Sequence, residues 1–272
     1  MSPLIGTLRD VSVEVRWQLS RQRRALIGWA VALAAVAGIY IPFYPAMGGP
    51  ELQSLVDALP RDLVSALGYD RIGTPEGYLT STVFGLLGPA LLVVFGVGVG
   101  ARTIAGEEEA GALELPASAP VRRDALLAGR IIAMHAQIAL LAAITFVVTV
   151  ALSEIVGLGV SVANIAAASV GLNLLAIAFA TVTLAAGAMT GRRGVAVAVG
   201  AGVAVTSYVM DALSGVVERG DVLEAISPFS WYLAGDPVAQ GVPIVGYALL
   251  GALTFVAWGV ALLRFPRRDL GV

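Results

Sequence analysis

Six apolar runs dominate this sequence, and each is long enough to cross a lipid bilayer as a helix. A spanning helix needs about 20 consecutive, mostly apolar residues, and few soluble folds contain such runs. The sequence therefore predicts an all-α polytopic membrane protein with a single transmembrane domain over residues 1–272. The expected spans run about Ala25–Tyr44, Leu79–Gly100, Ile131–Leu152, Ile165–Met189, Val195–Val217 and Val242–Leu263.

The arginines lie mostly on one side of the expected membrane. Only Arg61, Arg71 and Arg219 fall in the connections on the other side. Because basic residues collect in cytoplasmic loops, this bias predicts a multi-pass protein of the plasma membrane with both termini in the cytoplasm. Five tyrosines agree with this orientation, since they fall near the expected outer ends of spans, where an amphipathic ring prefers the interface. They are Tyr40, Tyr44, Tyr78, Tyr208 and Tyr247.

The first 24 residues are expected to form an amphipathic helix along the inner membrane surface. Apolar side chains recur there at helical spacing and form one stripe, with Arg9 and Glu14 off the stripe. An alternating pattern over residues 11–17 fits an extended strand as well, so both conformations stay open. The stripe consists of Leu4, Leu8, Val11, Val15 and Leu19.

Several reactive side chains are missing from the sequence. It has no cysteine and no lysine, and His135 is its single histidine. These absences exclude disulfides, thiol nucleophiles, the lysine of a phosphate-binding loop, a Schiff base and a two-histidine metal site. We therefore expect no catalytic residue, metal or cofactor on this chain. We expect the lipid bilayer as its surroundings and no nucleic-acid partner.

The longest connection on the arginine-rich side reads IAGEEEAGALELPASAPVRRDALLAGR, residues 104–130. Three consecutive glutamates, Glu107–Glu109, begin it, and Pro116 ends the short helix that follows. Pro120 suits the first turn of the next helix, which runs into the third span. The spacing predicts a helical hairpin with a short acidic helix at its elbow. Each glutamate stabilises a helix start by about 0.3–1 kcal/mol, which explains one or two of them as caps; the whole cluster favours a docking surface for a second protein.

The same connection resembles the cytoplasmic signature of type-2 ABC transporter permeases. That signature has acidic residues, a glycine, a Leu-Glu-Leu triplet and then Pro-Val-x-Arg, and this chain departs from it at Ala112 and Pro116. The sequence SPFSWY at 227–232 resembles the segment before the last span of these permeases. The matching residues are Gly111, Leu113, Glu114, Leu115, Pro120, Val121 and Arg123.

The resemblance implies a division of labour between two kinds of subunit. A separate ABC-type ATPase would carry the ATP and magnesium and would move the elbow, which acts as a cytoplasmic coupling helix between the second and third spans. The permease would work as a dimer with a second copy or a paralogue, with export as the expected direction. The implied ATPase-coupling residues are Glu107, Glu108, Glu109, Gly111, Leu113, Glu114, Leu115, Pro120 and Arg123.

Two polar residues inside spans are candidates for a translocation path. Asp211 lies in the outer part of the fifth span and Asn173 in the fourth. A carboxylate at mid-membrane costs about 2.5–3.5 kcal/mol on insertion scales, so its retention suggests a role in transport. Asp211 near the outer water, or Asn173 bonded across helices, would instead be structural. An ATP-independent secondary carrier or channel that uses Asp211 is the alternative function.

Overall fold

The computed structural model describes residues 18, 20–109, 123–218 and 220–264, and the elements found there are helical. Within these residues, six helices are long and apolar enough to cross a membrane, which confirms the predicted class and number of spans. The stripe predicted for the N-terminal helix lies outside the described residues. The spans are Arg23–Met47, Pro75–Gly106, Ala128–Val156, Val162–Thr190, Arg193–Ser214 and Ile244–Arg264.

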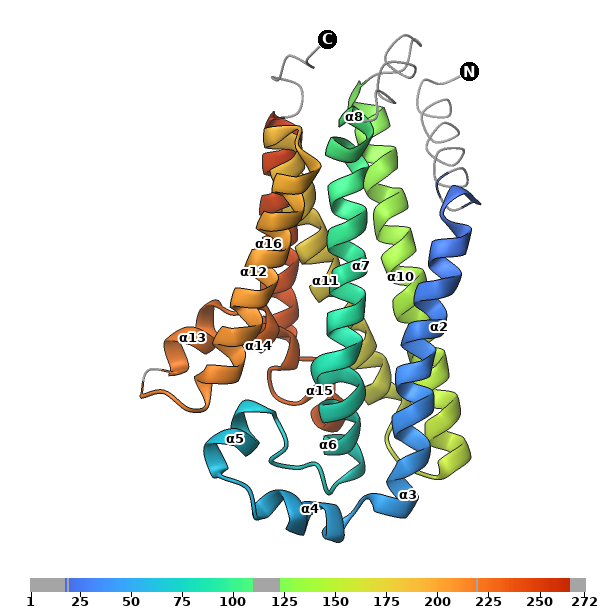
Figure 1. Ribbon diagram of the computed structural model, residues 1–272, viewed down its shortest axis with the longest axis vertical. Helices are drawn as coiled ribbons and strands as arrows, with labels where there is room; N and C mark the ends of the chain where they lie inside the picture. The colour runs from blue at the N-terminus through green and yellow to red at the C-terminus, as the bar shows by residue number, and fades with distance from the viewer. Residues whose placement is uncertain (1–17, 19, 110–122, 219, 265–272) are drawn as a thin grey trace.

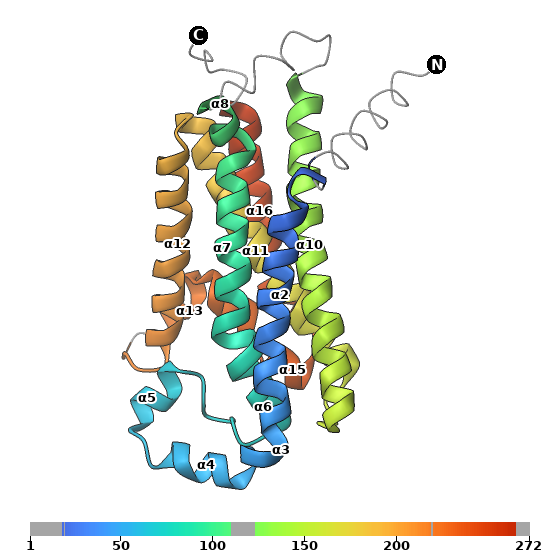
Figure 2. The same ribbon diagram turned by 45° about the vertical axis from the view of Figure 1, so that its right-hand side comes forward.

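Helix α11 (Val162–Thr190) is the centre of the bundle. It packs against four other spanning helices, α7, α10, α12 and α16. Helix α2 pairs with α10 along one flank, and α12 lies beyond α7 on the other (Figures 1 and 2). The bounds of these helices are Arg23–Tyr40 for α2, Gly88–Ala101 for α7, Arg123–Val156 for α10, Arg193–Ser214 for α12 and Ile244–Arg264 for α16.

The two ends of the bundle differ in structure (Figure 1). One end, called here the α8 end, holds α8 (Glu107–Glu109), the start of α2 and the last turn of α16. The opposite end is covered by short helices that continue from α2. These are η1 (Ile41–Phe43), α3 (Tyr44–Met47), α4 (Pro50–Asp57) and α5 (Arg61–Ala66).

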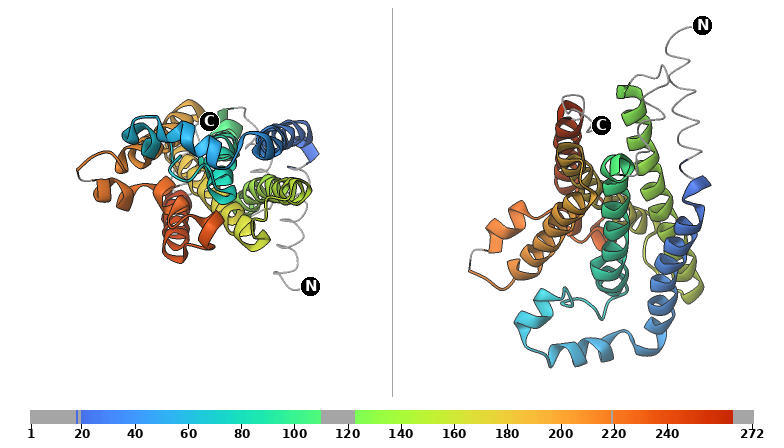
Figure 3. Two further views of the ribbon diagram at one scale, coloured as in Figure 1. Left: turned by 90° about the horizontal axis from the view of Figure 1, so that it is seen from below. Right: turned by 45° about the horizontal axis from the view of Figure 1, so that its top comes forward.

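Short helices also fill the connection between α12 and α16. Helix α12 ends at Ser214, before the predicted Val217, and α13 (Gly220–Ile226) then projects sideways from the bundle (Figure 3). Helices α6 (Pro75–Leu79), α14 (Pro228–Leu233) and α15 (Pro237–Gln240) each begin with a proline that follows a capping side chain. This order suits a helix start, because the first amide needs no helical partner. The caps are Thr74, Ser227 and Asp236.

The second span is broken by two π-helical stretches, η2 (Thr80–Leu87) and η3 (Arg102–Gly106). Pro89 accounts for the first of them. The amide of Gly88 donates to the carbonyl oxygen of Val83, five residues back. In this five-residue pattern the next carbonyl, that of Phe84, would accept from the backbone amide of residue 89, which is the proline. Proline has no N–H, and the Phe84 carbonyl is therefore left without a helical donor.

Tyr232 of α14 supplies the missing donor. Its hydroxyl donates to the carbonyl oxygen of Phe84 over 3.0 Å, and its side chain is 0% exposed. Burial raises the pKa of Tyr232 well above its ordinary value, so the hydroxyl keeps the proton that it donates. The SPFSWY segment is thereby joined to the second span at the point where proline interrupts that helix.

Two glycines of α7 allow close contact with α11. A Cβ atom at Gly96 would lie 2.9 Å from the carbonyl oxygen of Ala176, and one at Gly100 would meet the carbonyl oxygen of Ala180. Gly98, between them, has open space around it. Gly96 and Gly100 are small residues one helical turn apart, and they serve packing between the second and fourth spans of this chain.

We predict that Tyr232→Phe lowers the free energy of unfolding by about 1–3 kcal/mol, because the buried Phe84 carbonyl loses its donor. Denaturant titration in detergent micelles would measure the loss. Tyr208→Phe is the control, since Tyr208 contacts α14 through its ring, 5.4 Å between centroids from Phe229. Adding Pro89→Ala restores a backbone N–H and should recover part of the loss. If Tyr232→Phe lowers the free energy of unfolding by the same amount with Pro89→Ala as without it, this account is contradicted.

Candidate functional site

The acidic residues after α7 are tied to the start of the fifth span. The π-helix η3 continues α7 and places α8 beside the turn between α11 and α12. Glu109 Oε1 accepts a hydrogen bond from the backbone N–H of Arg193 over 2.9 Å. Arg193 is the first residue of α12, so this carboxylate occupies the helix start where an unpaired amide and the helix dipole favour negative charge.

The same end of the second span is also bonded to the third. Arg130 of α10 is 5% exposed, and its Nη1 donates to the carbonyl oxygen of Thr103 over 3.4 Å. Thr103 lies in η3, where the regular α-helical pattern of backbone bonds is broken. The end of the second span is therefore held to the third span by Arg130 and to the fifth by Glu109.

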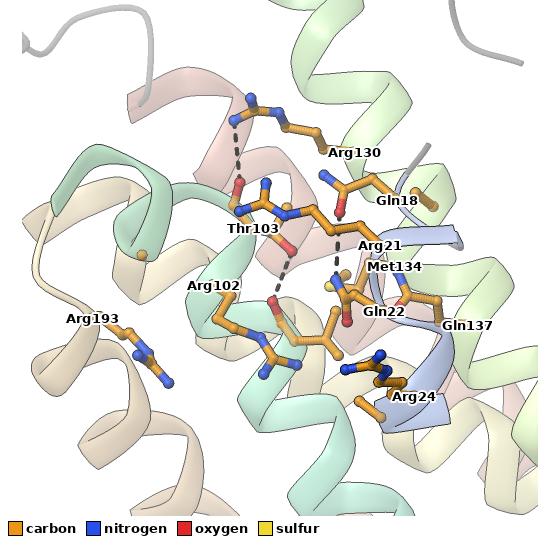
Figure 4. A pocket seen from close by; sticks show the side chains of 14 residues that line it. Gln18, Arg21, Gln22, Arg24, Arg102, Thr103, Arg130, Met134, Gln137 and Arg193 are labelled. Atoms are coloured by element: carbon orange, nitrogen blue, oxygen red, sulfur yellow. Dashed lines mark hydrogen bonds between the residues drawn. The ribbon is translucent and has the colours of Figure 1, made fainter. Parts of the chain in front are cut away.

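Five arginines line a cavity of about 440 Å³ at the α8 end (Figure 4). None of its described lining residues carries a carboxylate. Gln137 of α10 also lines this cavity; it is 1% exposed and its Oε1 atom has no hydrogen-bond partner. We call this space the arginine cavity. Its arginines are Arg21, Arg24, Arg102, Arg130 and Arg193.

Sequence reasoning used the arginines of this cavity only to orient the chain. It did not single out Gln137, and it did not predict that the arginines meet around one space. One signal was present, because Arg130 and Gln137 are seven residues apart and therefore share a helix face. The convergence of the other arginines depends on how four helices pack, which no local pattern reveals.

The residues predicted to couple to an ATPase are only partly described. The backbone of Glu107, Glu108 and Glu109 forms α8, and α10 begins at Arg123. Of these, Glu109 makes the contact with Arg193 given above. The remaining predicted coupling residues lie outside the described part of the chain, and the coupling role of the whole set stays a prediction. They are Gly111, Leu113, Glu114, Leu115 and Pro120.

Asp211 lies at a second cavity, of about 470 Å³, on the side of the bundle away from α8. Its Oδ1 atom accepts a hydrogen bond from the hydroxyl of Ser230 over 2.7 Å. One helical turn earlier on α12, the carbonyl oxygen of Ser207 accepts from the hydroxyl of Ser227 over 2.8 Å. Asp211 therefore both lines a polar cavity and fixes α14 on the fifth span.

Asn173, the other residue predicted for a translocation path, lines neither of these two cavities. Its Oδ1 atom is buried without a hydrogen-bond partner within α11. The structure therefore does not bring Asn173 and Asp211 to a common site. Within the described residues, no group of histidine, aspartate and glutamate side chains is arranged to hold a metal ion.

Comparison with known protein families gives a match that covers nearly the whole chain. The family described as ABC-2 family transporter protein matches residues 17–270. A comparison with curated proteins gives no match. The family match includes the spans, the acidic segment, the arginine cavity and the SPFSWY segment.

We predict that Asp211→Ala and Ser230→Ala each lower the free energy of unfolding by about 0.5–1.5 kcal/mol, because each removes one partner of a partly buried hydrogen bond. The double variant should lose less than the sum of the two, since the bond can be lost only once. Asp211→Asn keeps an acceptor oxygen and is the matched control. Additive losses in denaturant titrations would show that Asp211 does not hold α14 through Ser230.

Proposed function

Because the chain belongs to the ABC-2 family of transporter proteins, it is a membrane subunit of an ABC transporter, and we propose that it is an export permease driven by a separate ATPase subunit. The observation that carries the proposal is the family match over residues 17–270. ATP and magnesium would bind to the partner, since this chain has no lysine for a phosphate-binding loop. The permease would work as a dimer with a second copy or a paralogue.

The α8 end is the proposed cytoplasmic face, where the ATPase docks. Arginines support this orientation, because Arg102, Arg130 and Arg193 belong to the α8 end while Arg61 and Arg71 belong to the opposite end. Basic residues next to spans favour the cytoplasmic side. Both termini would then be cytoplasmic, and the short helices α3 to α5 would face the outside of the plasma membrane.

The acidic segment, residues 104–123, is the proposed contact with the ATPase. Two bonds support a coupling role for this region: Glu109 accepts from the amide of Arg193, and the carbonyl of Thr103, directly before the segment, accepts from Arg130. A force applied to this segment would act directly on the second, third and fifth spans. A basic groove on the ATPase would be the complementary surface, and such charge pairing gives specificity of partner choice.

The alternative, a carrier or channel that works without ATP through Asp211, has weaker support. Asp211 lines the second cavity, as a carboxylate in a transport path would. Its bond to Ser230 gives the carboxylate a structural reason to be there, and the family of the chain is one of ABC transporters. Capture of an ATPase by this chain is expected for the permease and not for the carrier or channel, so this measurement distinguishes the two functions.

We predict that the tagged chain, purified gently from its native membrane, brings down an ATPase of about 25–35 kDa, the size of an ordinary single domain. Changing Glu107, Glu108 and Glu109 together to alanine should abolish the capture, and changing them to arginine should do so more completely. The matched control changes three exposed carboxylates at the other end of the bundle to alanine and should not affect capture. These are Glu218, Asp221 and Glu224.

A smaller variant separates docking from the bond between Glu109 and Arg193. Glu107→Ala with Glu108→Ala leaves Glu109 bonded to the amide of Arg193. If this pair alone reduces capture, the effect does not pass through the bond between Glu109 and Arg193; if only variants of Glu109 do so, the effect passes through α12. Failure of the unaltered chain to capture any ATPase would remove the basis of the proposal and favour the alternative that uses Asp211.

A further inference from the structure

The arginine cavity gathers positive charge in one partly open space. Three of its arginines, Arg24, Arg102 and Arg193, make no ion pair with a described carboxylate. In Figure 4 the guanidinium groups of Arg24 and Arg102 point toward one another across the cavity. Like charges gathered in one space repel, so an anion bound between them would stabilise this arrangement.

Gln137 gives a second, independent indication of a ligand. Its side chain is 1% exposed and lines the cavity, yet its Oε1 atom has no hydrogen-bond partner. Buried polar atoms in proteins are almost always hydrogen-bonded, and an unpaired one points to a missing partner. The amide of Gln137 offers two N–H donors as well as this oxygen, so it suits a ligand with both acceptor and hydroxyl groups.

The depth of the cavity fits the headgroup region of a bilayer. Arg24 lies near the start of the first span, Arg102 near the end of the second and Arg193 at the start of the fifth. These positions lie where the hydrocarbon ends and lipid phosphates begin. Basic pockets between spanning helices are a known way to bind such groups. The volume, about 440 Å³, lies within the range of small-molecule sites, about 300–1,000 Å³.

We propose that the arginine cavity binds the phosphate group of an anionic ligand, which at this depth is the headgroup of an anionic phospholipid. Guanidinium groups match the oxygen geometry of phosphate with paired N–H donors. The glycerol hydroxyls of a headgroup would reach Gln137. This inference does not depend on the partner ATPase or on the direction of transport, because it concerns only residues of this chain.

Native mass spectrometry of the full chain in detergent tests the proposal with three probes. Phosphatidylglycerol is compared with diacylglycerol of the same acyl chains, which lacks the phosphate, and with inorganic pyrophosphate, which lacks the lipid. The test variant is Arg102→Gln with Arg193→Gln. The matched control is Arg192→Gln with Arg264→Gln, which removes the same charge at the same end but from residues that do not line the cavity.

We expect phosphatidylglycerol to bind the unaltered chain and the control pair alike, and the test variant at least about tenfold more weakly, as for the loss of charge-assisted hydrogen bonds. Gln137→Leu should weaken binding to a smaller extent. Pyrophosphate that binds alone and competes with phosphatidylglycerol, with the same dependence on Arg102 and Arg193, would assign the site to a soluble phosphate compound.

Two results would overturn the proposal. One is equal binding of diacylglycerol and phosphatidylglycerol, which would mean that acyl chains alone account for retention. The other is an equal loss of phosphatidylglycerol binding in the test and control pairs, which would mean that net charge, and not the cavity, holds the lipid. Monodisperse elution in size-exclusion chromatography reports whether each variant folds. If the test pair does not fold, Arg24→Gln is scored in its place, since Arg24 is an exposed lining residue on α2.

Discussion

A polypeptide in hydrocarbon must satisfy each backbone carbonyl and amide from within the protein, because no water is present to do so. Much of this architecture follows from one place where that requirement is hard to meet. Pro89 removes a donor from the second span, the helix widens into η2, and the carbonyl of Phe84 loses its regular partner. Tyr232 fills that position from a segment 148 residues away along the chain. The packing of α14 against the second span is thus a consequence of backbone chemistry as well as of shape.

The fifth span links the two ends of the molecule. At the α8 end its first amide, that of Arg193, is bonded to Glu109. Toward the other end, Ser207 and Asp211 bond to α14, which in turn reaches the second span through Tyr232. A rigid helix fixed by hydrogen bonds at both ends transmits a displacement along its length. The second and fifth spans are therefore joined twice, once near each end, and movement of one requires movement of the other.

The sequence was sufficient for the number of spans. Long apolar runs identify spans because a membrane imposes their length, whereas the caps Thr74, Ser227 and Asp236 were recognised only in the structure. The fifth span was predicted to reach Val217 because Val216 and Val217 are apolar, although the helix ends at Ser214. Hydrophobicity alone does not distinguish the last turn of a helix from an apolar loop that follows it.

The sequence did not predict the contacts between distant residues that make up the candidate sites. The SPFSWY motif names no partner for Tyr232, and only the packed structure reveals that its hydroxyl meets the Phe84 carbonyl. Likewise two complete spans separate Arg102 from Arg193 in the sequence, and their approach depends on the order of helices around α11. Pairings between distant segments follow from tertiary packing, whereas periodicity reports only which face of a helix is apolar.

Arg193 belongs to both features of the α8 end. Its backbone amide holds Glu109, and its side chain lines the arginine cavity. The two groups are connected by covalent bonds within one residue at the first turn of α12, so neither can be displaced far without affecting the other. A partner that pulls on the acidic segment would alter the wall of the cavity, and a ligand that holds Arg193 would resist that pull. If the proposed occupant of the cavity and the proposed partner at Glu109 both act on Arg193, thermodynamic linkage requires that each changes the affinity of the other by the same factor.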